Sequence, residues 1–316
     1  MIIDSHAHYS RFKYDGDFRY IAPPSYSNED SDPVYEYDVL RGTRQELLEN
    51  IRAGEICGII EPAIEFETNE KLIKLARKYP DFIFPAVGLH PARCTVENFR
   101  RRKALKAFAD QSGIIAIGET GLDYHRAAEK AERRLQKKMF IYQIKLAHRH
   151  RLPLILHIRN SNIPGDANAY ENAYKILKRY SRYLHGGVAH CFSEDRVTAD
   201  KFISLGLKIG IGGMLIGSDE ASMRLENTVA GIPITSILVE TDAPFVLPSN
   251  ERLVCSSHQK RKILNSSLIL PEIIEKIAKL KKTAYAEAEK AVFDNTVAVF
   301  GLDAYAFNAQ NKLKGE

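Results

Sequence analysis

Two histidines separated by one residue stand close to the N-terminus, where His6 and His8 end a run that includes the apolar residues Ile2 and Ile3. In an extended chain residues i and i+2 point to the same side, so both imidazoles would face one space. Neutral imidazole is a good ligand for zinc and neighbouring transition metals. The pair therefore indicates a divalent-metal site if the chain supplies further ligands, and an ordinary histidine pair at a strand end if it does not.

Further potential ligands stand at the ends of four other apolar segments. They are Glu119 after 114–118, His157 after 154–156, His190 after 187–189 and Asp242 after 237–241. Any one of them could be a polar residue that bonds a neighbouring loop, but six such residues in one chain predict a metal centre. A carboxylate beside a metal-bound water can act as a general base, so hydrolysis is the expected reaction class.

The segments that must position these residues alternate between strand and helix candidates. Strands are expected at 1–8, 56–60, 82–87, 114–117, 154–157, 187–190, 207–211 and 237–240. Helices are expected at 43–53, 69–79, 96–111, 129–150, 169–180, 195–205, 218–229, 269–280 and 285–300. Short strands that are apolar throughout, each followed by a helix, form a parallel sheet covered by helices.

Eight such strands favour closure into a single α/β barrel of the (β/α)8 TIM type, and an open doubly wound sheet is the alternative. In a parallel barrel the C-terminal ends of all strands meet at one rim, where the active sites of such barrels lie. The six candidate ligands would converge at that rim although they are far apart in the sequence.

Residues 11–38 do not follow this alternation, because they are polar and aromatic without a helical or a strand period. We expect a long loop inserted between the first strand and the first helix. It would lie over the metal site as a lid whose tyrosines stack on bases and whose acidic residues repel a long duplex, which favours a short or single-stranded end. Simple packing against the barrel is the alternative. The tyrosines are Tyr14, Tyr20, Tyr26, Tyr35 and Tyr37, and the acidic residues include Asp15, Asp17, Glu29, Asp30 and Asp32.

The composition is that of a globular protein with a sizeable core, with 45% hydrophobic and 27% charged residues and a formal net charge of +5. No linker separates two parts, so one domain over residues 1–316 is expected. The four cysteines are far apart, which favours a reducing compartment. Neither a signal sequence nor a long apolar run is evident, so we expect a cytoplasmic protein with no membrane partner.

The segments around the candidate ligands resemble the successive signatures of TatD-related deoxyribonucleases. The resemblance runs in order from Ile2 to about Leu302 and leaves out the loop after His8. The matching runs are Asp4-Ser5-His6-Ala7-His8, Gly88-Leu89-His90-Pro91, Gly118-Glu119-Thr120-Gly121-Leu122-Asp123-Tyr124, His157-Ile158-Arg159, His190-Cys191-Phe192-Ser193 and Glu240-Thr241-Asp242-Ala243-Pro244.

This resemblance implies a metal-dependent hydrolase of the amidohydrolase superfamily that cuts DNA phosphodiesters, with DNA as substrate and no obligate protein partner. It implies two divalent ions, with zinc, manganese and magnesium as the candidates. The catalytic carboxylates would be Glu119, which bridges the ions, and Asp242, which accepts a proton from the attacking water. His90 and Arg159 would meet a substrate phosphate. The positions that match the metal ligands are His6, His8, Glu119, His157, His190 and Asp242.

The inserted segment after His8 departs from the family pattern and bears on the substrate rather than on the ligands. Two alternatives therefore stay open. One is a metal-dependent ester or amide hydrolase, for example one that deacylates aminoacyl-tRNA. The other is a metal-bound scaffold that binds nucleic acid without catalysis, although such a binder would have no need of a general base at Asp242.

Overall fold

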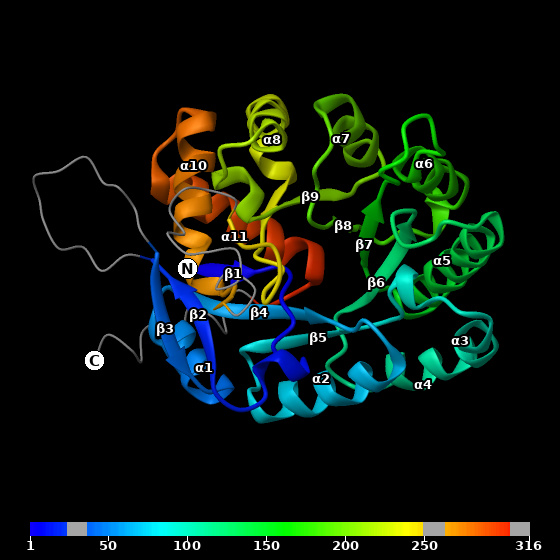
Figure 1. Ribbon diagram of the computed structural model, residues 1–316, viewed down its shortest axis with the longest axis horizontal. Helices are drawn as coiled ribbons and strands as arrows, with labels where there is room; N and C mark the ends of the chain where they lie inside the picture. Colours follow the sequence, from blue (N-terminus) through cyan, green and yellow to red (C-terminus); the bar gives the residue numbers. More distant parts are fainter. Residues whose placement is uncertain (24–36, 249–262, 304–316) are drawn as a thin grey trace, which may run out of the picture.

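Eight parallel strands form the centre of the computed structural model, which describes residues 1–23, 37–248 and 263–303. They are hydrogen-bonded to one another in chain order (Figure 1). The strands are β1 (Ile2–Asp4), β4 (Ile56–Pro62), β5 (Ile83–Val87), β6 (Ala116–Asp123), β7 (Leu154–Arg159), β8 (Gly187–Ala189), β9 (Lys208–Ile211) and β10 (Ile237–Val239). All eight predicted strands are present, and β6 extends well past its predicted end.

The sheet curls round so that β10 returns to the first strand. The backbone N–H of Ser5 donates to the carbonyl of Val239 at 3.0 Å, and an isolated parallel bridge joins Ala7 to Ala243. These few contacts, rather than a full ladder, close the barrel. The predicted (β/α)8 barrel is confirmed, and the open-sheet alternative is wrong.

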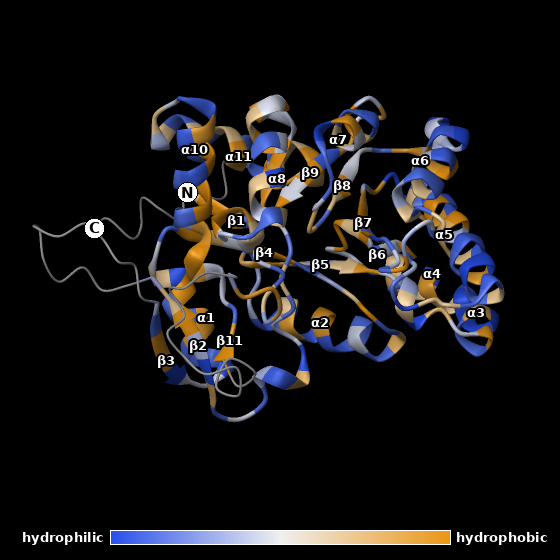
Figure 2. Ribbon diagram, turned by 45° about the horizontal axis from the view of Figure 1, so that its top comes forward, coloured by the Kyte–Doolittle hydropathy of each residue, from blue (hydrophilic) through white to orange (hydrophobic). Residues whose placement is uncertain are grey.

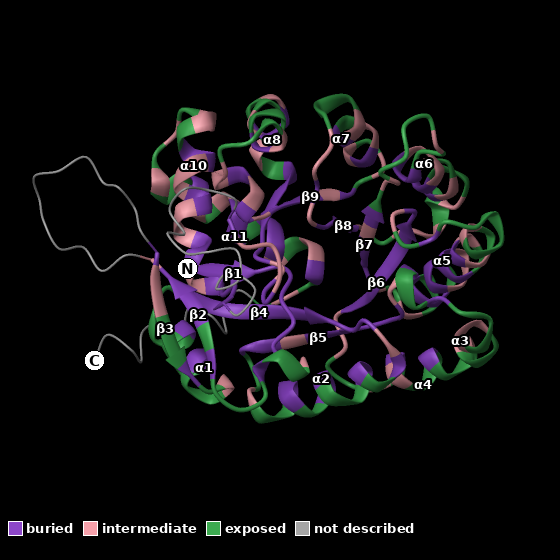
Figure 3. Cartoon of the chain, in the orientation of Figure 1, coloured by how far each residue is buried: buried purple, intermediate pink, exposed green. Residues whose placement is uncertain are grey.

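Helices surround the strands and are buried on the side that faces them. In α10, for example, Ile273, Ile274 and Ile277 are completely buried at helical spacing. Figure 2 shows hydrophobic residues concentrated on the strands, and Figure 3 shows buried strands inside a partly exposed shell of helices. The helices are α1 (Arg44–Ala53), α2 (Phe66–Lys78), α3 (Val96–Arg101), α4 (Leu105–Ala109), α5 (Lys130–His150), α6 (Ala169–Arg179), α7 (Arg196–Ile203), α8 (Glu220–Gly231), α10 (Leu270–Lys281) and α11 (Tyr285–Phe300).

One predicted helix, 96–111, is not continuous. It divides into α3 and α4, with a 3-10 turn (Arg102–Ala104) between them. The guanidinium of Arg102 donates to the carbonyl oxygen of Phe99 at 2.8 Å and lies over the Phe99 ring. The side chain thus satisfies a carbonyl at the end of α3 where the helix tightens.

Within the described ranges, no helix is long and apolar enough to cross a membrane.

The segment 11–38 is not the structureless loop that the sequence suggested. It contains a 3-10 turn (Phe12–Tyr14) and the strand β2 (Phe18–Ala22), which pairs antiparallel with β3 (Asp38–Gly42) and parallel with β11 (Ile263–Leu264). Along β2 only Arg19 is exposed, and the neighbouring residues Tyr20 and Ile21 are both buried, so both faces of the strand are covered there.

The prediction that the tyrosines of this segment stack on bases is wrong for those that the structure describes. Tyr14, Tyr20 and Tyr37 are buried in the core. Asp15 and Asp17 form ion pairs with Arg44 and Arg41, which reduces their repulsion of a phosphate backbone. The other residues of that prediction, Tyr26, Glu29, Asp30, Asp32 and Tyr35, lie outside the described residues.

The buried carboxylate of Asp4 joins three parts of the chain where the barrel closes. Its Oδ2 accepts hydrogen bonds from the hydroxyls of Thr241 and Ser267, both at 2.6 Å. Its Oδ1 accepts from the backbone N–H groups of His6 and Thr241, both at 3.1 Å. Burial raises the pKa of Asp4 to about 6, although these four hydrogen bonds oppose the rise. Asp4 therefore fixes the backbone of two segments that carry candidate ligands.

We expect Asp4→Ala to lower the free energy of unfolding by about 3 kcal/mol, because two buried hydroxyls and two backbone N–H groups would lose their acceptor. Urea denaturation of chelator-treated protein measures this effect without a contribution from metal loss. Asp200→Ala is the control, because the side chain of Asp200 is half exposed and its ion pair is with Arg196 of the same helix. An Asp4→Ala variant as stable as the control would show that the junction does not depend on this carboxylate.

Candidate metal centre

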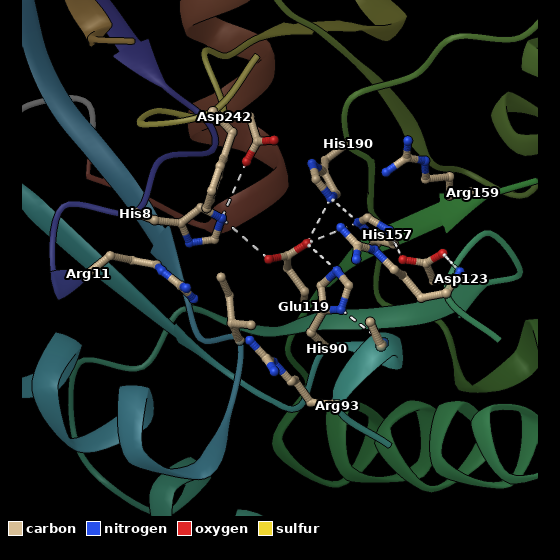
Figure 4. Close-up of a pocket in the computed structure, with 14 residues that line it drawn as sticks. His8, Arg11, His90, Arg93, Glu119, Asp123, His157, Arg159, His190 and Asp242 are labelled. Atoms are coloured by element: carbon tan, nitrogen blue, oxygen red, sulfur yellow. Dashed lines mark hydrogen bonds and ion pairs between the residues drawn. The ribbon is translucent and has the colours of Figure 1, made fainter. Parts of the chain in front are cut away.

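All six predicted ligands come together at the C-terminal rim of the barrel. Five of them, all except His6, line a pocket of about 440 Å³ (Figure 4). His6 lies behind the pocket wall, completely buried, with its ring stacked on that of His190 at 3.7 Å between centroids. His6 and His8 do not lie within β1, which ends at Asp4, but in the segment that follows it.

Glu119 occupies the middle of this group (Figure 4). The sequence had suggested a position just after the strand, but Glu119 lies inside β6. Its Oε1 is 3.3 Å from His8 Nε2 and 3.8 Å from His6 Nε2. Its Oε2 is 2.9 Å from His190 Nε2 and 3.4 Å from His157 Nδ1. Each carboxylate oxygen therefore faces its own pair of imidazole nitrogens from the predicted ligands.

Burial alone would raise the pKa of the Glu119 carboxyl, but His90, His190 and His157 hold this pKa well below its usual range. The group is therefore a carboxylate at neutral pH, although its side chain is almost completely buried. A buried anion between two sets of imidazoles is an arrangement that bound cations would stabilise.

The spacing of the nitrogens fits metal coordination. His6 Nε2 lies 3.1 Å from His8 Nε2, and His157 Nδ1 lies 3.2 Å from His190 Nε2. Ligand nitrogens at the Zn–N distance of a tetrahedral site are separated by about 3.3 Å. Asp242 Oδ1 adds a second carboxylate oxygen on the first side, 3.3 Å from His8 Nε2 and 3.6 Å from His6 Nε2.

Two of the histidines have an acceptor beside their other ring nitrogen. His8 Nδ1 lies 3.1 Å from the carbonyl oxygen of Pro62, and His157 Nε2 lies 3.3 Å from Asp123 Oδ2. His190 Nδ1 lies 3.8 Å from a carboxylate oxygen of Glu240, which is too far for a hydrogen bond. Acceptors in these places favour the tautomers whose free lone pairs point at Glu119, a common arrangement around metal-binding histidines.

Sequence reasoning assigned no role to Asp123 or Glu240. Both stand inside runs that were matched to the family, Asp123 four residues after Glu119 and Glu240 two residues before Asp242. That placement was the available signal, but the sequence could not show which histidine each would face. Small clusters such as His6, His190 and Glu240 could also hold an ion by distance alone.

His90 has the geometry of a hydrogen-bond donor rather than of a ligand. Its Nδ1 accepts from the backbone N–H of Ala92 at 3.0 Å, so in the neutral ring the proton is on Nε2. Burial, with help from His157, lowers the pKa of His90 to about 3, which keeps the ring neutral. Its Nε2 lies 3.7 Å from Glu119 Oε2, so an N–H group borders the ligand cluster.

Four arginines line the same pocket: Arg11, Arg93, Arg126 and Arg159. Only Arg159 was predicted, and it is the exposed last residue of β7. Arg93 pairs with Glu65, whereas Arg11, Arg126 and Arg159 make no ion pair with a carboxylate in the part of the chain that the structure describes. Sequence reasoning missed Arg11, Arg93 and Arg126, which stand three positions after His8, His90 and Asp123, respectively. Their charges suit the pocket to an anionic ligand.

The family model described as "TatD related DNase" matches residues 3–301 of the chain. The chain belongs to this family. The resemblance found in the sequence is thereby confirmed. Among curated TatD relatives, the 3'-5' ssDNA/RNA exonuclease TatD of Rahnella sp. is 28% identical over 261 residues, which cover 83% of this chain and 93% of the relative.

A second relative, described as an uncharacterized metal-dependent hydrolase, YabD of Bacillus subtilis, is 26% identical and covers 96% of this chain and all of its own length. Among solved structures, the TatD homologue YjjV of Escherichia coli superposes with a TM-score of 0.72 at 25% identity, covering 96% of this chain and 98% of its own. A TatD-family hydrolase of Entamoeba histolytica, 19% identical with a TM-score of 0.69, has the same fold and covers 95% of this chain and 97% of its own.

We expect Asp123→Ala to weaken one of two metal equivalents by about 10–100-fold, because His157 would lose the carboxylate that orients it. Competition between the protein and a chromogenic chelator for Zn²⁺ measures both equivalents separately. Asp110→Ala is the matched control, since the side chain of Asp110 is about half exposed and pairs with Lys106. If the Asp123→Ala protein bound both equivalents as tightly as the control, the orienting role of Asp123 would be refuted.

Proposed function

We propose that this TatD-family chain is a metal-dependent nuclease that hydrolyses phosphodiester bonds and trims single-stranded nucleic acid from an end. The observation that carries the proposal is the position of Glu119, whose two oxygens face two separate pairs of imidazole nitrogens. Such a carboxylate can bridge two divalent ions. The match to the family over 3–301 supports treating the barrel as one functional unit. The single domain over 1–316 and the cytoplasmic location remain predictions within this proposal.

The ligands divide into two sets that share Glu119. His6, His8 and Asp242 would hold one ion, and His157 and His190 would hold the other. When bound, such an ion pair lowers the pKa of a bound water and neutralises charge on the phosphate oxygens. The four imidazoles favour zinc or manganese, while magnesium prefers oxygen ligands.

Asp242 is the residue to which we assign the general base. Its side chain is 16% exposed, and it lines the pocket while Oδ1 faces the histidines. Its backbone N–H donates to the carbonyl of His6 at 2.9 Å, and its φ of +52° is one that aspartate tolerates better than most residues. A carboxylate held in this way accepts the proton of the attacking water at its oxygen.

His90 and Arg159 bind the scissile phosphate in this proposal. The Nε2–H of His90 donates to one non-bridging oxygen, and the guanidinium of Arg159 can grip two. His90 lies beside Glu119, and Arg159 lines the same pocket, which supports these roles. The developing negative charge of the transition state is then met by donors that are already in position.

The charge of the pocket favours a phosphodiester over an acyl substrate. Three of the pocket arginines make no ion pair with the carboxylates that the structure describes, and they suit the phosphates of a nucleic acid, whereas a neutral amide would leave them unused. The Rahnella relative is named for action on both single-stranded DNA and RNA, so we extend the predicted DNA substrate to either polymer. Non-catalytic binding is disfavoured because a scaffold that only binds nucleic acid has no need of a general base at Asp242.

We expect Asp242→Asn to lower kcat on single-stranded DNA about 100-fold to 10,000-fold, because the amide cannot take up the proton. The assay compares single-stranded DNA, duplex DNA, RNA and aminoacyl-tRNA, each with Zn²⁺, Mn²⁺ or Mg²⁺. Metal content is measured in the same samples, and Asp200→Asn is the control. Equal activity of wild type and Asp242→Asn would reveal a contaminant. Turnover of aminoacyl-tRNA alone would replace the nuclease by an acyl hydrolase.

A further inference from the structure

A cluster of two cations and one aromatic ring borders the pocket on the side of His8. Arg11 and Phe245 line the pocket, and Lys13 Nζ lies 4.5 Å from the centre of the Phe245 ring. The guanidinium carbon of Arg11 lies 5.7 Å from the same centre, and the Phe245 ring meets the ring of His8 edge-on at 6.0 Å. None of the three residues is a predicted metal ligand, the general base or a contact of the scissile phosphate.

The contacts of this cluster are not those of a structural salt bridge. Neither Arg11 nor Lys13 forms an ion pair with a carboxylate among the described residues, and the buried Nε of Arg11 has no hydrogen-bond partner there. Partial burial, together with the charge of Arg11, lowers the pKa of Lys13. Two neighbouring cations that raise each other's energy are therefore held beside an open pocket, where an anion would stabilise both.

The cluster lies on the opposite side of Glu119 from Arg159. Figure 4 shows Arg11 beside His8 on one side, and His157 and Arg159 on the other. A nucleic-acid strand whose scissile phosphate lies at Glu119 must continue to one of these sides. On the His8 side, its next phosphate would meet Arg11 and Lys13, and its next base would meet Phe245.

We propose that Arg11, Lys13 and Phe245 form a subsite for the nucleotide next to the scissile phosphate. This inference rests on the proposed nuclease function. Arg11 and Lys13 bind the flanking phosphate, which draws the cations off the ring, and the base then stacks on Phe245. Stacking on an aromatic ring requires an unpaired base and tolerates any sequence and either sugar. The ligand class is therefore single-stranded nucleic acid, DNA or RNA.

The subsite gives the inserted segment a role that differs from the one expected from its sequence. Arg11 and Lys13 belong to that segment, next to the 63% exposed ring of Phe12. The segment's described tyrosines pack into the core, and Asp15 and Asp17 are paired with arginines. It therefore contributes to substrate selection by placing cations beside the metal centre.

The test is a cycle that combines changes in the protein with changes in the substrate. Short single strands carry either an abasic nucleotide or a neutral methylphosphonate linkage at each position flanking the cleaved bond. KM is measured for wild type, Arg11→Ala, Phe245→Ala, Phe245→Tyr and the control Arg41→Ala. Arg41 lies in β3, is strongly exposed and pairs with Asp17. Circular dichroism and metal content verify that each variant is folded and loaded.

At one flanking position, removing the base should raise the KM of wild type about tenfold. The same removal should leave the KM of Phe245→Ala unchanged. Phe245→Tyr and Arg41→Ala should keep the full dependence on the base. The methylphosphonate should raise the KM of wild type and have a smaller effect in Arg11→Ala, in which Lys13 alone still meets the flanking phosphate.

Additive effects of protein and substrate changes at every position would overturn the subsite. If these effects were additive but wild type still hydrolysed the strands and bis(p-nitrophenyl) phosphate, the proposed function would stand without the subsite. Failure of wild type to hydrolyse any phosphodiester would overturn both.

Discussion

The arrangement of the site depends on one buried carboxylate. Glu119 lies among imidazoles from four other places in the chain. It carries a negative charge although its side chain is almost completely buried. Each of its oxygens faces two nitrogens of the predicted metal ligands, at distances between 2.9 and 3.8 Å. This arrangement is costly without positive charge nearby, since desolvation of a carboxylate is expensive. Bound divalent cations would offset that cost, so the geometry of the ligands and the charge of Glu119 have the same explanation.

The barrel supplies the rigidity that such a site needs. Gly121 has a φ of +130°, and a Cβ there would lie 2.2 Å from the carbonyl oxygen of His157, so glycine permits the close pairing of β6 with β7. That pairing brings the strand of Glu119 next to the strand of His157. On the other side, Asp4 bonds the backbone of both His6 and Thr241, and so aligns the first ligands with Asp242.

The sequence was sufficient for the barrel because each strand is a short apolar run and each helix has its own periodicity. It was also sufficient to predict that residues at strand ends would meet. It failed for 11–38, where burial of Phe18 and Tyr20 in β2 depends on pairing with β3 and with distant β11. The orientation of the histidines could not be predicted either, because it depends on acceptors such as the Pro62 carbonyl and Asp123, which only the tertiary structure brings close.

The central claim is that Glu119 bridges two ions, and crystals grown with Mn²⁺ test it most directly. Anomalous difference maps recorded near the manganese edge locate each ion without reference to enzyme activity. The account predicts two peaks, one between Glu119 Oε1 and the His6–His8 pair and one between Glu119 Oε2 and the His157–His190 pair. A single peak, or two peaks on the same side of Glu119, would contradict it.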